Sequence, residues 1–224
     1  AMHESFVRAE EMARALGFAF ASKKYRESKA LSQGTPFSVN GNEVCFSTIG
    51  DASTSEGIFW EVINAAGVLQ VPLVISVWDD GYGISVPVEY QTTKGSISAV
   101  LSGFEPDENN AGVRIYTEKA WRYPDLVALY KRVIDDARQQ HQPALIHIQE
   151  VTQPQGHSTS GSHERYKSKE RLQWERDFDC ILQMEQWMIA EGLASPDEIR
   201  QIRDKARKTV KEARDRAWKA YATP

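Results

Sequence analysis

The sequence predicts an α/β fold in which a mostly parallel sheet is flanked by helices. Short apolar runs rich in β-branched residues, typical of buried strands, alternate along the chain with amphipathic patterns of helical period. A helix between two such runs returns the chain to the same end of the sheet, so the flanking strands are parallel. The predicted strands cover residues 44–49, 73–78, 113–116 and 144–148, and the crossover helices cover residues 59–69 and 124–137.

The N-terminal part adds a helix and an irregular segment before the first core strand. Apolar residues recur at helical spacing over residues 1–25, whereas residues 27–36 are polar and predict a surface insertion. Asn40-Gly41 is a two-residue hairpin signal and predicts a short extra strand. The chain opens inside the first helix, so we expect the natural polypeptide to extend further upstream.

Acidic residues follow two neighbouring predicted strands. Asp51 comes directly after Gly50, in a loop of small residues over 50–57, and Asp79-Asp80 follows the next strand. Ligands of open α/β sheets bind outside the carboxyl ends of the strands, so we expect these carboxylates to face one crevice. A hard cation that bridges carboxylates and a phosphate group suits this arrangement.

Each acidic site also has a purely structural alternative. Asp51 could cap the following helix, a role that Ser53, Thr54 or Ser55 could also fill. Asp79-Asp80-Gly81 could serve only as a turn, because Asp and Gly favour turns for backbone reasons. A turn and a metal site are compatible with one another.

The C-terminal part is predicted to be helical after a polar loop. Residues 153–165 are rich in Gly, Ser and Thr and contain His157 and His163, and residues 166–191 predict a helix. Ser195 opens a capping box for a long charged helix, whose apolar stripe consists of Ile199, Ile202, Ala206, Val210, Ala213 and Ala217. We expect residues 1–190 to form one domain and residues 191–224 a helical extension packed on it, in preference to a partner-binding helix.

Composition excludes several classes of protein. The chain has 224 residues, 41% of them hydrophobic and 26% charged, with a net charge of −4, which predicts one globular core and no nucleic-acid partner. No apolar run reaches the roughly 20 residues that span a bilayer, and no signal-peptide pattern opens the chain, so we expect a cytoplasmic protein without a membrane association. Cys45 and Cys180 lack metal or disulfide spacing and are expected to be reduced and buried.

The acidic motif and its surroundings resemble a known family. Gly-Asp-Ala at 50–52, a spacing of 26 residues and then Asp79-Asp80 resemble the thiamine-diphosphate signature. The context at 55–87 and the later Gly156-His157-Ser158-Thr159-Ser160 narrow the resemblance to the alpha part of the first, decarboxylating component of 2-oxo acid dehydrogenase complexes. It covers most of residues 6–190. The tract at 151–157 is also similar to a bacterial branch in which alpha and beta parts are fused.

The resemblance implies a cofactor site that holds thiamine diphosphate through Mg²⁺. The metal ligands would be the side chains of Asp51 and Asp80 and the carbonyl of Tyr82. The implied cofactor-binding residues are Gly50, Asp51, Ala52, Ser53, Asp80, Tyr82, Gly83, Ile84 and His157. Two positions depart from the family pattern: Ala52 replaces a glycine, and Asp80 replaces an asparagine, which keeps an oxygen ligand but adds a negative charge beside a diphosphate.

His157 is the implied catalytic residue, either as a proton donor or as a cofactor contact. A lone loop histidine is by composition more often solvated, and only the Gly-His-Ser-Thr-Ser match and its position after a strand raise it to a candidate. Phosphorylation of the loop serines, known in some relatives, is not carried over, because the family's aspartate is Gly161 here. His147 alternates with apolar residues and is predicted to be structural.

By the same resemblance, the chain is part of an oxidoreductase that decarboxylates a 2-oxo acid and passes the acyl group to a lipoyl domain. Thiamine diphosphate supplies the hard chemistry, and a glutamate of a beta-type domain or subunit completes the site, so this chain alone would be inactive. A branched-chain substrate is favoured and pyruvate is the rival. We expect a homo-oligomer or an alpha-beta heterotetramer. The alternatives are a transketolase-like enzyme and a non-catalytic interaction module that has lost the cofactor.

Overall fold

The structure, a computed structural model, describes residues 2–157 and 163–223, with only the backbone described for residues 2–10. The chain divides into two compact units, Ala1–Cys180 and Ile181–Pro224. That residues 191–224 extend the same domain as residues 1–190 stays a prediction.

The first unit is built on a four-stranded parallel sheet, as the alternation of apolar runs predicted. The strand order is β1-β2-β6-β5, and each neighbouring pair is parallel. A separate antiparallel pair, β3 and β4, lies beyond the end of β2. The strands are β1 Cys45–Gly50, β2 Leu73–Trp78, β3 Tyr82–Gly83, β4 Val86–Pro87, β5 Arg114–Lys119 and β6 Ala144–Gln149.

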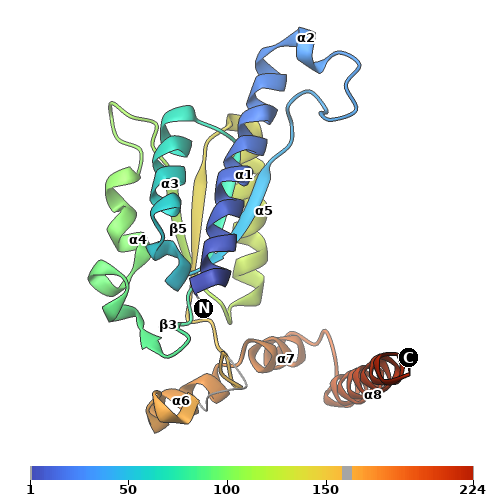
Figure 1. Cartoon of the computed structure of the whole chain (residues 1–224). Coiled ribbons are helices and arrows are strands. Elements are labelled where there is room, and N and C mark those ends of the chain that lie inside the picture. The colour runs from blue at the N-terminus through green and yellow to red at the C-terminus, as the bar shows by residue number, and fades with distance from the viewer. Residues whose placement is uncertain (1, 158–162, 224) are drawn as a thin grey trace. The chain divides into compact units, whose positions relative to one another are not determined.

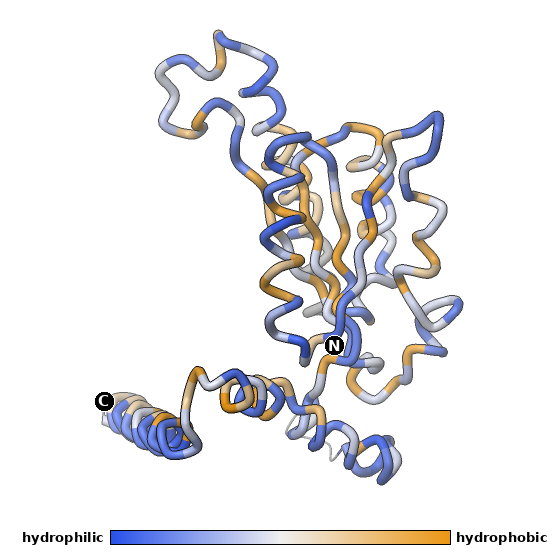
Figure 2. The backbone as a smooth tube through the Cα atoms, turned by 180° about the vertical axis from the view of Figure 1, so that it is seen from behind, coloured by the Kyte–Doolittle hydropathy of each residue, from blue (hydrophilic) through white to orange (hydrophobic). Residues whose placement is uncertain are grey.

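Helices cover both faces of this sheet (Figure 1). On one face α1 and α3 pack on strand residues such as Ile75 and Val77, with Phe59 of α3 fully buried. On the other face α5 packs on Val74 and Ile146. The hydrophobic colouring of the strands in Figure 2 follows from this burial on two sides. The helices of this unit are α1 Met2–Glu27, α2 Lys29–Ser32, α3 Gly57–Leu69, α4 Ile97–Val100, α5 Tyr123–Gln140 and α6 Lys169–Asp177.

Short 3-10 helices connect these elements. They are η1 Ala52–Ser55, η2 Val88–Tyr90, η3 Thr93–Gly95, η4 Leu101–Phe104 and η5 His163–Arg165. The first of them, η1, joins the end of β1 to α3, so the loop of small residues after Gly50 is wound into one tight turn. This turn brings backbone amide groups to the tip of the strand.

The predicted hairpin at Asn40-Gly41 is wrong. Both residues have the positive φ that the signal requires, 59° and 67°, yet no strand precedes β1 in the described part of the chain. The Glu43 carboxylate accepts hydrogen bonds from the Val39 amide and from the Ser22 hydroxyl of α1. The Val39 amide is therefore bound to a side chain and does not pair with a neighbouring strand. A tertiary contact therefore outweighs the local turn signal.

The single helix predicted over residues 166–191 is also wrong in extent. It is divided into α6 and α7 Cys180–Ala190, with a break at Phe178 and Asp179. The Phe178 ring stacks on Trp174 at 5.3 Å and also lies 5.1 Å from the Trp121 ring. Packing on an aromatic residue from a distant segment thus sets the end of α6.

The second unit contains most of α7 and the helix α8 Pro196–Ala222. The predicted capping box is present: the Ser195 hydroxyl accepts from the Glu198 amide, and the Glu198 carboxylate accepts from the Ser195 amide. Of the apolar stripe only Ile199 is buried, whereas Ile202 and Val210 are exposed. Packing of this stripe on the rest of the chain stays a prediction.

Neither cysteine forms a disulfide in the part of the chain that the structure describes. Cys45 and Cys180 are free, as expected, but both are partly exposed, so the expectation that they are buried is wrong. Among the helices that the structure describes, none combines the length and the apolar character that a bilayer crossing requires.

Candidate functional site

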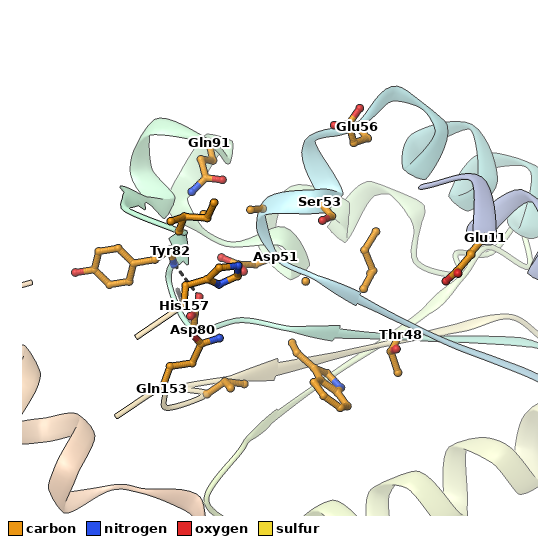
Figure 3. A pocket seen from close by; sticks show the side chains of 17 residues that line it. Glu11, Thr48, Asp51, Ser53, Glu56, Asp80, Tyr82, Gln91, Gln153 and His157 are labelled. Carbon is orange, nitrogen blue, oxygen red and sulfur yellow. Dashed lines mark hydrogen bonds between the residues drawn. The ribbon is translucent and has the colours of Figure 1, made fainter. Parts of the chain in front are cut away.

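A cavity of about 560 Å³ opens at the carboxyl ends of β1 and β2. Figure 3 shows that its lining side chains come from η1, from the segment after β2 and from the loop after β6. All of the residues predicted to bind the cofactor line it: Gly50, Asp51, Ala52, Ser53, Asp80, Tyr82, Gly83, Ile84 and His157. The structure therefore brings the predicted set together, while the role of each residue stays a prediction.

Asp51 lies at the tip of β1 with a buried carboxylate. Its amide donates to the Trp78 carbonyl at 3.1 Å, which ties the tip of β1 to the end of β2. The side chain is only 6% exposed and forms no capping hydrogen bond to the described residues of η1, so the helix-cap alternative is wrong. The Oδ2 atom of Asp51 is buried without a hydrogen-bond partner among the described residues, which is costly for a carboxylate unless a ligand binds it.

Both carboxylate oxygens of Asp79 form hydrogen bonds within the protein. Its Oδ1 accepts from the Gly81 amide at 2.8 Å, which makes the turn that the sequence alternative described. Its Oδ2 pairs with Nε2 of His147 at 2.8 Å, and Nδ1 of His147 lies 2.9 Å from the Ser98 hydroxyl. His147 is fully buried, in agreement with its predicted structural role.

Asp80 points into the cavity from the same turn. Its side chain is 7% exposed, and its Oδ1 accepts from the Tyr82 amide at 3.0 Å. The Tyr82 ring points away from the cavity in Figure 3 and packs at 5.7 Å from the Tyr166 ring. Tyr82 can therefore take part in the site only through its backbone, as the predicted carbonyl ligand requires.

Burial and mutual repulsion disfavour the charged form of the acidic side chains at this site. Burial raises the pKa of Asp51 to about 8, and the charges of Asp79 and Asp80 contribute to this rise. Burial also raises the pKa of Asp80, while the Tyr82 amide and the charges of Lys167 and His157 oppose that shift. A cation bound between Asp51 and Asp80 would relieve both effects.

The donor set fits a magnesium ion that is shared with a phosphate group. The Oδ2 atom of Asp51 and the carboxylate of Asp80 are hard oxygen ligands, which Mg²⁺ prefers. In the part of the chain that the structure describes, no group of three or more His, Cys, Asp and Glu side chains is arranged to hold a metal ion. The predicted set has two carboxylates and one backbone carbonyl, so a bound ion would take its other ligands from water and diphosphate oxygens.

His157 completes the cavity from the loop after β6. Figure 3 shows its imidazole beside Asp51 and Asp80. Ser158, Thr159 and Ser160 of the predicted motif, and Gly161, lie outside the described residues. Beyond them, His163 packs on Gly156, where an added Cβ would lie 3.1 Å from its Nδ1.

Several lining residues were missed at the level of sequence. They include Glu11, Thr48, Trp78, Gln91 and Gln153. Only Gln91 is connected with a feature of the sequence, the glycine at position 83. A Cβ added at Gly83 would lie 2.5 Å from Oε1 of Gln91, so the Gln91 side chain occupies the space that a larger residue would need. The glycine at position 83 therefore indicates a close neighbour, although the sequence does not say which one.

Fold and site together define an α/β domain whose acidic side chains gather at adjacent strand ends, where open α/β sheets bind their ligands. The comparison with known families agrees with this class. The chain belongs to the dehydrogenase E1 component family, whose model matches residues 2–224. Membership of this family implies thiamine diphosphate as the cofactor.

The curated relatives are alpha subunits, which confirms the resemblance to the alpha part. The chain is 29% identical over 183 residues to the 3-methyl-2-oxobutanoate dehydrogenase subunit alpha of Mycobacterium tuberculosis, covering 80% of this chain and 47% of the relative. It is 25% identical over 214 residues to the mitochondrial 2-oxoisovalerate dehydrogenase subunit alpha of Mus musculus, covering 93% and 42%. It is 21% identical over 172 residues to the pyruvate dehydrogenase E1 component subunit alpha of Rickettsia bellii, covering 77% and 50%. The chain thus spans about half the length of these relatives.

Proposed function

We propose that this chain is the part of an E1 alpha component that anchors Mg²⁺ and the diphosphate of thiamine diphosphate. The observation that carries the proposal is the buried Oδ2 of Asp51, unpartnered among the described residues, in the same cavity as Asp80. An unbound carboxylate oxygen in such a place costs stability, and a bound cation would offset that cost.

In this proposal Asp51, Asp80 and the Tyr82 carbonyl hold the metal. The backbone amides of Ala52 and Ser53 meet the diphosphate, because both residues line the cavity at the start of η1. Gly50, Gly83 and Ile84 shape the wall of the cavity. His157 contacts the cofactor or donates a proton to the reacting group.

Bound thiamine diphosphate would supply the electron sink for decarboxylation of a 2-oxo acid. This chain's own residues bind and orient the cofactor at its diphosphate end. A beta-type domain or subunit completes the site, and the acyl group passes to a lipoyl domain of an acyltransferase component. We infer a branched-chain 2-oxo acid as the substrate, with pyruvate as the rival, and a cytoplasmic homo-oligomer or alpha-beta heterotetramer.

Calorimetric titration of the intact protein with thiamine diphosphate, with and without Mg²⁺, tests the proposal. We expect binding that depends on Mg²⁺, its loss in Asp51→Ala, and retained or improved affinity in Asp80→Asn, because the amide keeps an oxygen ligand and removes a negative charge. Glu61→Gln is the control, since Glu61 is exposed on α3 and should leave the affinity unchanged.

Abolition of binding by Asp80→Asn would contradict the assigned role of that residue. No Mg²⁺-dependent binding in the intact protein would instead favour a module that has lost the cofactor. A transketolase-like enzyme would bind the cofactor but would show no lipoyl-dependent turnover.

A further inference from the structure

A buried cluster of charged residues lies behind the turn that carries Asp80. It consists of Lys167, Arg171 and Glu175, from α6 and the segment before it. Oε1 of Glu175 accepts from Nζ of Lys167 at 2.7 Å and from Nε of Arg171 at 2.9 Å. The side chains of Lys167 and Glu175 are only 2% and 1% exposed, whereas that of Arg171 is 28% exposed.

This cluster contacts the proposed metal turn at both of its ends. Nη2 of Arg171 donates to the backbone carbonyl of Asp80 at 2.7 Å. The Arg171 guanidinium lies 5.5 Å from the centre of the Tyr82 ring, and Nζ of Lys167 lies 4.8 Å from it. Asp80 and Tyr82 are the two residues of this turn that would supply metal ligands.

The cluster has more positive than negative charge, and its two cations lie near the Asp80–Tyr82 turn. Lys167 and Arg171 share the one carboxylate of Glu175, so the cluster carries one positive charge in excess. Both cations face the Asp80–Tyr82 turn, where the Asp80 carbonyl accepts from Arg171 and the Tyr82 ring lies near Lys167 and Arg171. Oε2 of Glu175 is buried without a partner among the described residues, so the three residues are not optimised as a self-contained ion cluster.

We propose that Arg171, anchored by Glu175, is a positioning residue for the metal ligands of the Asp80–Tyr82 turn. The inference rests on the proposed function. The guanidinium fixes the peptide plane after Asp80 through its carbonyl and holds the Tyr82 ring outside the cavity. The Asp80 carboxylate and the Tyr82 carbonyl are thereby kept pointing inward.

The geometry requires an arginine. One planar guanidinium uses Nε for Glu175 and Nη2 for the Asp80 carbonyl, and it also faces the Tyr82 ring. A lysine at this position has a single ammonium group, which cannot make the same two hydrogen bonds in fixed directions. We therefore expect Arg171→Lys to replace the function only in part.

The test measures the affinity of the intact protein, with its beta-type partner present, for Mn²⁺ at saturating thiamine diphosphate. Free Mn²⁺ is followed by electron paramagnetic resonance. We expect Arg171→Ala to weaken Mn²⁺ binding about tenfold, which corresponds to ~1.4 kcal/mol. Arg171→Lys should fall between that variant and the unmodified protein. Arg176→Ala is the matched control on the same helix, because Arg176 is exposed and its guanidinium donates to the neighbouring Gln173.

A second measurement separates positioning from simple stabilisation. Thermal unfolding without ligands reports the structural role, and the rise in unfolding temperature with Mn²⁺ and cofactor reports the affinity. A lower ligand-free unfolding temperature with Mn²⁺ affinity within about twofold of the unmodified protein would overturn the inference. If Arg171→Ala does not fold, Arg171→Lys and Glu175→Gln decide by the same criterion. Failure of the unmodified protein to bind Mn²⁺ would refute the proposed function itself, and the inference with it.

Discussion

Burial and the neighbouring carboxylates raise the pKa of Asp51 to about 8 from 3.8, so we expect this residue to hold a proton at neutral pH when no cation is bound. Between these two values the folded chain binds a proton that the unfolded chain has lost. The free energy of unfolding therefore falls as the pH rises through this window. A metal ligand must be deprotonated, so cation binding and proton loss are coupled at this residue.

We expect the binding of Mg²⁺ with thiamine diphosphate at pH 7 to release about one proton from Asp51. Calorimetry in two buffers of different ionisation enthalpy measures this number directly. Asp79→Asn removes one of the charges that raise the Asp51 pKa, so this variant should release less. Equal heats in both buffers for the unmodified protein would show that Asp51 is already ionised.

At the scale of single residues, the sequence predicts those site residues that directly follow a strand. Asp51 and Asp80 were found because each follows an apolar run by one or two positions. Arg171 was missed, because its hydrogen bond to Asp80 joins residues 91 positions apart. Likewise, the link from Ser98 through His147 to Asp79 exists only in the folded chain, where β6 lies next to β2.

At the scale of elements, the loop between η4 and β5 depends on close backbone packing. The Val113 amide donates to the Phe104 carbonyl at 2.7 Å, and Gly112 has a φ of +55°. A Cβ at Gly112 would lie 2.5 Å from that carbonyl oxygen. Both the positive φ and the contact exclude a side chain at this position.

We expect Gly112→Ala to lower the free energy of unfolding by about 2 kcal/mol, because a left-handed non-glycine residue and a backbone shift each carry a cost. Gly103→Ala is the control from the same loop region, since a Cβ added there would meet none of the described residues within 4 Å and its φ is not positive. Urea unfolding measures both variants. An equal effect of the two substitutions would mean that the contact at Gly112 relaxes freely.

The periodicity of apolar residues predicts the strands and helices of the core. All four core strands and both crossover helices lie where the apolar pattern predicted them, because each buries a face that its own residues define. The errors at Asn40-Gly41 and at Phe178 arise where partners from distant segments, Ser22 and Trp121, determine the local conformation. Patterns within a short window contain no information on such partners.

At the scale of the whole molecule, the chain supplies only one side of the proposed active site. Glu56 lines the cavity, but Figure 3 shows its carboxylate directed away from Asp51 and Asp80, and Glu61 is exposed on α3. Neither is placed to activate the distal ring of a cofactor whose diphosphate would be held through a cation at Asp51 and Asp80. The glutamate that the chemistry requires is therefore expected from a beta-type domain.

We expect the isolated chain to show no turnover of 2-oxo acids with Mg²⁺ and thiamine diphosphate, and the addition of a beta-type partner to restore it. Reduction of a lipoyl-dependent acceptor measures this activity, and comparing a branched-chain 2-oxo acid with pyruvate identifies the preferred substrate. Turnover by the chain without a partner would count strongly against a divided site.

Ile84, at the wall of the cavity, has a φ of 61°, a conformation that a β-branched residue rarely adopts. A glycine there would be less strained, yet it would let the backbone after Tyr82 sample many directions before a ligand arrives. The isoleucine keeps this φ at a cost of about 1–3 kcal/mol, so the surrounding structure must hold the backbone in place. Strain of this kind clusters at ligand-binding sites, and Ile84 carries it at the wall of the cavity beside Tyr82.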